Sequence, residues 1–135
     1  MQKRLVNPAE APAPAGPYSQ VAELDLGSGK LLILSGQVAL DDANKEIVGA
    51  GDMTVQADRT LEIIGRLLAA HGATFADVVN IRTYLTDMGH RAEYAAVRAK
   101  YFTGDLPTST TVEVSKLFRD EALIEIEVTA AVSAA

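Results

Sequence analysis

The sequence predicts an α+β fold: a mixed six-stranded sheet with two helices packed on one face. Residues 106–117 and 123–132 alternate apolar and polar side chains and are rich in β-branched residues, a pattern typical of strands. Residues 52–71 carry apolar side chains at helical spacing, and a second helix is expected at residues 87–103. We expect residues 1–135 to form one domain of ordinary size.

Four further strands complete the expected sheet. They are predicted at residues 3–7, 18–26, 31–34 and 75–86. Gly27 and Gly29 predict a hairpin turn, because glycine adopts the positive backbone angles of tight turns. The order of elements is then three strands, a helix, a strand, a helix and two strands, which favours a layered sheet with helices on one side.

The alternation also assigns side chains to faces. In the fourth strand, the residues expected to share one face are Val79, Ile81, Thr83 and Leu85, and those expected opposite them are Arg82 and Tyr84. In the last strand, Glu125 and Glu127 share a face, where they repel each other unless a cation, a donor or a cleft receives them.

Both helices have an apolar side. In the first, which Asp52 or Thr54 caps and Gly72 ends, it comprises Val55, Ala57, Leu61, Ile64, Leu67 and Leu68. In the second, the expected buried residues are Tyr94, Ala95, Val97, Ala99, Tyr101 and Phe102. With both helices on one face, the other sheet face has no cover. We therefore expect it to meet another subunit.

Composition excludes several classes of protein. The chain has no cysteine, so disulfides and thiolate metal sites are ruled out. Its net charge of −6 and scattered basic residues argue against nucleic-acid binding. His71 and His90 are isolated, and no metal site is expected. No signal peptide or membrane span is expected, which makes a cytoplasmic protein the default.

Five short motifs occur in a characteristic order and spacing. They are Gly16-Pro17-Tyr18-Ser19-Gln20, Ser35-Gly36-Gln37, the run from Arg82 to Met88, the run from Pro107 to Val114, and Ile124-Glu125-Ile126-Glu127. Together they cover essentially the whole chain, and in this register the sequence resembles the RidA family, also called the YjgF/YER057c/UK114 family.

The resemblance implies a chorismate-mutase-like fold and a homotrimer with three ligand clefts between neighbouring subunits. It implies a cofactor-free site for small carboxylates or ketoacid-like molecules. The best-known activity of the family is hydrolysis of imines or enamines, which releases ammonia and a ketoacid.

Site residues carry over from the resemblance position by position. Glu125 matches the glutamate that holds the attacking water, which is a sensible general base. The residues that match or neighbour the ligand-binding positions are Tyr18, Ser35, Gly36, Ser109 and Thr111. Glu127 has the alternative of being a solvated acid on an outer strand.

Ser109 departs from the family pattern. Deaminating members have an arginine at this position, two residues after the proline, whose guanidinium clamps the substrate carboxylate. Loss of such a clamp costs about 2–4 kcal/mol, or about 30- to 1,000-fold in affinity. Arg82, Arg98 and Arg119 are candidates for a relocated clamp, and each is alternatively a structural or surface cation.

Three functions therefore remain open. The chain is an imine or enamine deaminase, a non-catalytic ligand-binding or regulatory trimer, or a ribonuclease, a role attached to some relatives. The acidic charge of the chain disfavours the third.

Overall fold

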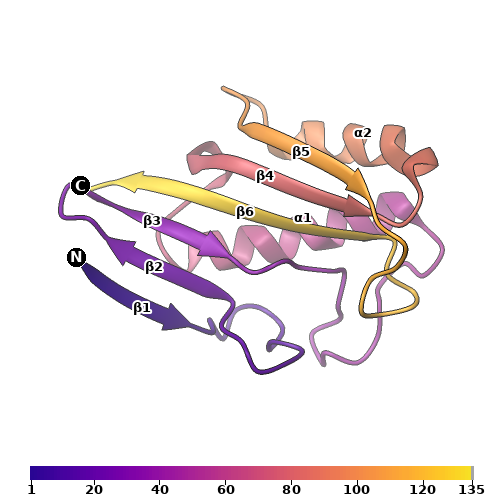
Figure 1. The fold of residues 1–135 in the computed structure, drawn as a ribbon, viewed down its shortest axis with the longest axis horizontal. Helices are drawn as coiled ribbons and strands as arrows, with labels where there is room; N and C mark the ends of the chain where they lie inside the picture. The colour runs from indigo at the N-terminus through magenta and orange to yellow at the C-terminus, as the bar shows by residue number, and fades with distance from the viewer. Residues whose placement is uncertain (135) are drawn as a thin grey trace.

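A computed structural model describes residues 1–134, which form a six-stranded mixed sheet with both helices on one face (Figure 1). The strands are β1 (Gln2–Val6), β2 (Val21–Asp25), β3 (Gly29–Leu34), β4 (Val78–Leu85), β5 (Thr108–Glu113) and β6 (Ile124–Ser133). The helices are α1 (Met53–Ala69) and α2 (Arg91–Tyr101), and short 3₁₀ turns η1 (Phe75–Asp77) and η2 (Met88–His90) precede β4 and α2. The predicted fold class is confirmed.

The last strand in the sequence lies in the interior of the sheet. The strand order is β1-β2-β3-β6-β4-β5, and β6 pairs with both β3 and β4. All pairings are antiparallel except that of β4 with β5, which is parallel because α2 connects them. Along β6, Ile124, Ile126 and Val128 are buried against the helices, and the intervening residues face the other way.

Helix α1 supplies most of the helical side of the core. Asp52 caps it, since its Oδ1 accepts a hydrogen bond from the amide of Val55 at 3.1 Å. The buried apolar residues of α1 are Met53, Ala57, Leu61, Ile63, Ile64, Leu67 and Leu68. Gly72, with a φ of +75°, follows the helix in the left-handed conformation that glycine adopts at no steric cost.

Several local predictions were wrong. The strand expected at residues 75–86 begins at Val78, because residues 75–77 form η1. A bulge between Val78 and Asn80 breaks the alternation, so that Val78 is buried with Ile81 whereas Val79 is exposed. The strands expected at residues 18–26 and 106–117 are shorter, and β3 begins at Gly29, inside the expected turn.

Three residues assigned to the apolar sides of the helices are exposed. They are Val55 in α1 and Ala95 and Ala99 in α2. Tyr94 and Val97 are the buried residues of α2, and Phe102, which follows the helix, is buried as well. The exposed alanines give α2 a small apolar surface toward solvent.

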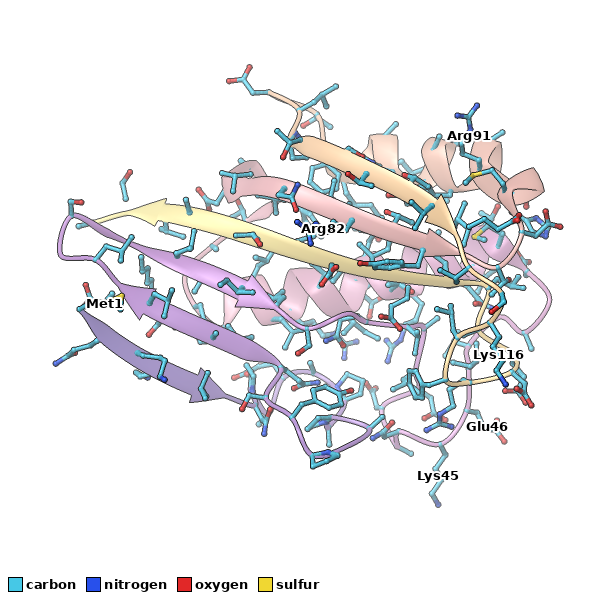
Figure 2. All side chains as sticks on the ribbon, viewed as in Figure 1. Met1, Lys45, Glu46, Arg82, Arg91 and Lys116 are labelled. Atoms are coloured by element: carbon cyan, nitrogen blue, oxygen red, sulfur yellow. The ribbon has the colours of Figure 1, made fainter. Side chains whose placement is uncertain are left out.

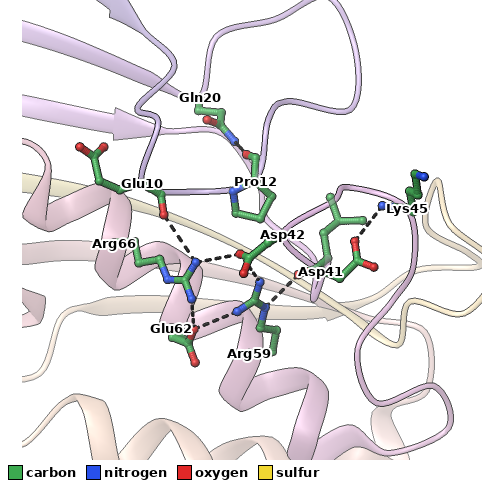
Figure 3. A network of polar contacts seen from close by, with 10 residues as sticks. Glu10, Pro12, Gln20, Asp41, Asp42, Lys45, Arg59, Glu62 and Arg66 are labelled. Carbon is green, nitrogen blue, oxygen red and sulfur yellow. Dashed lines mark hydrogen bonds and ion pairs between the residues drawn. The ribbon is translucent and has the colours of Figure 1, made fainter.

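A network of charged residues holds the loop after β3 against α1 (Figure 3). Arg59 and Arg66 each bind both Asp42 and Glu62, at distances of 2.6–3.1 Å. Nε of Arg59 also donates to the carbonyl of Leu40 at 2.9 Å. The network fixes the course of the chain between the end of β3 and the start of α1.

The sheet face opposite the helices, here called the open face, has no covering layer within the described chain (Figure 1). Leu5, Ala22 and Ile33 stand side by side across β1, β2 and β3 on this face. Leu5 is 60% exposed and Ile33 44% exposed. The open face therefore combines an apolar row with the polar side chains of β4 and β6.

Candidate functional site

Glu125 lies on the open face, at the start of β6. The chain that leaves β3 runs alongside it, because the backbones of Gln37 and Ile126 exchange two hydrogen bonds, of 2.8 and 3.0 Å. This bridge brings Gly36 against the Glu125 side chain. A Cβ atom at position 36 would lie only 2.9 Å from Cδ of Glu125, so a residue with a side chain would displace the Glu125 carboxylate.

The Glu125 carboxylate is half-buried and has no hydrogen-bonding or charged partner among residues 1–134. Burial raises its pKa above the ordinary value of a glutamate, and the negative charge of Glu127 raises it further. A carboxylate with a raised pKa is a stronger base than a solvated one. Glu125 is thus better suited than a solvated glutamate to accept a proton from water.

Glu127 has a different environment. Its Oε1 accepts a hydrogen bond from the hydroxyl of Tyr84 at 2.5 Å, and Arg82 is paired with it across β4 and β6. The hydrogen bond to Glu127, followed by burial, raises the pKa of Tyr84. Figure 2 shows Arg82 on the same open face. Glu127 is therefore held by its neighbours, and Glu125 is the carboxylate left available.

Ser35 directly precedes Gly36 in the chain, and a hydrogen bond connects it to the segment that follows Tyr18. Oγ of Ser35 donates to the carbonyl of Ser19 at 2.6 Å, which joins the segment after Tyr18 to the end of β3. The Tyr18 side chain is 44% exposed, and its hydroxyl accepts from the amide of Ala15 at 3.2 Å. We call Tyr18, Ser35, Gly36 and Glu125 the acid half-site.

Ser109 and Thr111 lie on the opposite side of the sheet. They are paired with Ile81 and Thr83, whose side chains are buried beneath the helices. Nη1 of Arg98, on α2, donates to Oγ of Ser109 at 2.8 Å. We call Arg98, Ser109 and Thr111 the arginine half-site. Within one chain, the structure does not bring it together with the acid half-site.

A groove of about 630 Å³ runs along α2 beside the arginine half-site. Its lining comprises Arg91, Ala92, Tyr94, Ala95, Arg98, Ala99, Phe102, Leu106 and Thr111, with no acidic residue. Figure 2 shows Arg91 on α2 at the edge of the molecule. Two guanidinium groups and an apolar floor make this groove suitable for an anion with an apolar part.

The three candidate arginines have separate positions. Arg119 donates to the carbonyls of Lys45 and Asn44, at 2.9 and 3.4 Å, and so fixes a loop. Arg82 lies on the open face. Arg98 alone of the three binds Ser109.

The sequence reasoning missed the groove and the contact of Arg98 with Ser109. One signal was available: positions 91, 95, 98 and 102 lie on one side of a helix, because their spacing follows its 3.6-residue period. The prediction for α2 assigned Ala95 to the buried side of the helix, and the shared side of these four positions was therefore not recognised.

Among residues 1–134, no cluster of histidine, aspartate and glutamate side chains has the arrangement of a metal site. In the same part of the chain, neither helix is long and apolar enough to cross a membrane.

Comparison with known proteins identifies the family. A family model described as Endoribonuclease L-PSP matches residues 8–132. Protein DfrA of Myxococcus xanthus is 42% identical over 119 residues, which are 88% of each chain. The 2-iminobutanoate/2-iminopropanoate deaminase of Mus musculus is 32% identical over 125 residues, covering 93% of this chain and 88% of that protein.

Solved structures agree with this assignment. YyfA of Yersinia pestis, a member of the conserved Rid protein family, superimposes with a TM-score of 0.85 at 31% identity, covering 97% of this chain and 100% of that one. TdcF of E. coli with bound serine gives a TM-score of 0.84 at 29% identity, covering 97% and 100%. The chain therefore belongs to the Endoribonuclease L-PSP family, the RidA (YjgF) family that its motifs predict.

Proposed function

We propose that this protein is a cofactor-free homotrimer that binds small carboxylate or carbonyl metabolites between subunits and hydrolyses imines or enamines. The observation that carries the proposal is Glu125, a half-buried carboxylate without a partner in the described chain and with a raised pKa. The name of the mouse relative, an iminobutanoate and iminopropanoate deaminase, supports the reaction class. The serine bound to TdcF supports a small carboxylate as ligand.

The two half-sites of one chain lie on opposite faces of its sheet, which supports a cleft shared by two subunits. The acid half-site of one subunit would face the arginine half-site of the next. The apolar row on the open face supplies a reason for the subunits to associate. Three equivalent clefts follow from a closed ring of three chains.

In the proposed reaction, Glu125 accepts a proton from a water molecule as the water oxygen bonds to the imine carbon. Glu125 returns this proton to the imine nitrogen, which gives a carbinolamine. The carbon–nitrogen bond then breaks as the proton of the carbinolamine hydroxyl is transferred to the nitrogen, so that ammonia leaves and the carbonyl product forms. An enamine first tautomerises to the imine and follows the same route. The attack of water requires a carboxylate that is ionised and close to the water molecule.

Replacement of Glu125 by glutamine tests the catalytic step. We expect Glu125→Gln to lower ammonia release from enzymatically generated imines at least ~100-fold, the usual scale of a lost general base. The matched control is Glu46→Gln, which removes an exposed carboxylate and should leave the rate unchanged. A purified wild-type protein that releases no ammonia from any imine of the panel would remove the catalytic half of the proposal.

A non-catalytic ligand-binding protein is the second candidate, and Ser109 favours it because the strand arginine of deaminating members is missing. It predicts thermal stabilisation by small carboxylates without turnover, and an unchanged function in Glu125→Gln. RNA cleavage that survives repurification and disappears in a single-site variant would favour the ribonuclease role instead.

A further inference from the structure

Arg98 places a guanidinium group next to the position from which the strand arginine is missing. We propose that Arg98 is the carboxylate clamp of this protein, reaching the cleft from α2 instead of from β5. The inference rests on the proposed function for the location of the cleft, and goes beyond it by assigning the residue that selects the ligand. The main evidence for this assignment is the hydrogen bond that Nη1 of Arg98 donates to Oγ of Ser109, at 2.8 Å.

Aromatic rings and a chain of hydrogen bonds orient this guanidinium. Its carbon lies 5.9 Å from the centre of the Tyr94 ring and 5.6 Å from that of Phe102, within the range of cation–π attraction. Nη1 also donates to the hydroxyl of Tyr94 at 3.3 Å, and that hydroxyl bonds to buried Thr83 at 2.5 Å. The group is thus positioned before a ligand arrives, which lowers the entropic cost of binding.

The same guanidinium retains free donors. Its hydrogen bonds to the described residues all come from Nη1, so Nη2 and Nε keep their three N–H groups unused. No carboxylate of residues 1–134 lies within ion-pair distance of Arg98, whereas Arg4, Arg59 and Arg66 each have at least one. A fork of unused N–H groups matches the two oxygens of a carboxylate.

The surroundings define the chemical class of the ligand. Arg98 lies in the groove along α2, where Arg91 adds a second positive charge and no acid opposes them. Ala95, Phe102 and Leu106 give the groove an apolar surface, and Thr111 adds one hydroxyl. This combination suits a small monocarboxylate with a short apolar chain, and disfavours a cation or an uncharged amide.

Binding of a carboxylate and of its amide measures the clamp directly. We expect wild-type protein to bind 2-oxobutanoate about 30- to 1,000-fold more tightly than 2-oxobutanamide in an NMR titration, the scale of a bidentate charged contact. Arg98→Met should abolish that preference, and Arg98→Lys should restore only part of it, because a lysine presents one point charge. Lys100→Met, which removes a cation of the same helix outside the groove, should keep it.

A double variant distinguishes a direct ligand contact of Arg98 from a purely structural role. Combining Arg98→Met with Ser109→Arg returns a guanidinium to the strand, and we expect the preference for the carboxylate to return. A folded Arg98→Met protein that keeps the preference, or a wild-type protein that shows none, would overturn the inference.

The outcome is separable from that of the proposed function. Protein that shows an Arg98-dependent preference but no imine hydrolysis keeps the clamp and loses the reaction. Protein that hydrolyses imines with the same KM in wild type and Arg98→Met keeps the reaction and loses the clamp.

Discussion

Glu125 and Glu127 differ by two residues in sequence, yet they have different chemistry available to them. Tyr84 donates a hydrogen bond to Glu127, and Arg82 lies across from it, so its negative charge is stabilised. Glu125 packs against Gly36 without such a donor in the described chain. At the scale of single residues, the environment decides which member of the acidic pair is left free for the proposed role of base.

The negative charge of Glu127 acts on the pKa of Glu125, which predicts a change in the pH dependence of activity. Glu127→Gln removes this neighbouring charge and keeps the Glu125 carboxyl group whose pKa is measured. We expect the pKa of Glu125 to fall but to remain above its ordinary value, because burial is the larger cause of the shift. Since the base acts only when ionised, the acidic limb of the pH–rate profile should move to lower pH.

A titration of the Glu125 carboxyl carbon by NMR measures that pKa without relying on activity. Glu46→Gln removes a distant exposed acid and should leave the titration in place. An unchanged or raised pKa in Glu127→Gln would contradict the coupling.

At the scale of elements, a buried hydrogen bond between His71 and Glu23 connects β2 with the end of α1. Nδ1 of His71 lies 2.9 Å from Oε1 of Glu23, and both side chains are buried. Lys30 and Arg4 also approach Glu23, at 3.1 and 3.3 Å. His71 follows the end of α1, where a positive charge complements the helix dipole. Its carboxylate partner lies far away in the sequence and gives it a second role, in packing.

Glu23→Gln tests this role through stability. The hydrogen bond from His71, helped by Lys30, lowers the pKa of Glu23 against the opposing effect of burial. A lowered pKa means that the contribution is complete above the ordinary value of about 4.5 and is lost as pH falls through the folded-state value. We expect Glu23→Gln to lower the free energy of unfolding at pH 7 by about 1–3 kcal/mol.

Urea denaturation at pH 7 and at acidic pH provides the measurement. The difference between wild type and Glu23→Gln should shrink in acid, whereas Glu46→Gln should match wild type at both pH values. A difference that grows as pH falls would show the opposite sign of linkage.

Helices and strands could be predicted from the sequence where a periodic pattern of apolar residues determines them. The alternation of Ile124, Ile126 and Val128 in β6 and the helical spacing of α1 survive in the structure, because each follows from a repeating burial pattern. The bulge at Val78 was not predictable, since it inserts one residue into a pairing that only the neighbouring strand reveals.

The candidate site was likewise predictable only in part. Motifs pointed to Gly36 and Glu125, and the structure places Gly36 directly against the Glu125 side chain. The contact between Arg98 and Ser109 depends on how α2 lies over β5, and local sequence does not encode that geometry. The separation of Ser109 from Glu125 likewise depends on which strand faces are covered.

At the scale of the whole molecule, the proposed trimer depends on the open face. Ile33 lies at the inner end of its apolar row, between Ala22 and Thr129 on neighbouring strands. We expect analytical ultracentrifugation to give a trimer for wild type and a smaller species for Ile33→Glu, because the variant would bury a charge without a partner.

The matched control is Val55→Glu, an equally exposed apolar residue on the helical side, which should remain trimeric. A monomeric wild-type protein at micromolar concentration would contradict the proposed assembly, as would an Ile33→Glu protein that stays trimeric.

The position of the two half-sites on opposite faces of one sheet has a thermodynamic consequence. In the proposed trimer, a ligand held by Arg98 of one chain and approached by Glu125 of another would bridge two subunits. Its binding free energy would then contribute to assembly, and assembly would contribute equally to its binding, because the two equilibria are linked. Metabolite concentration and subunit concentration would therefore act on the same equilibrium, and the ligand would strengthen the ring that binds it.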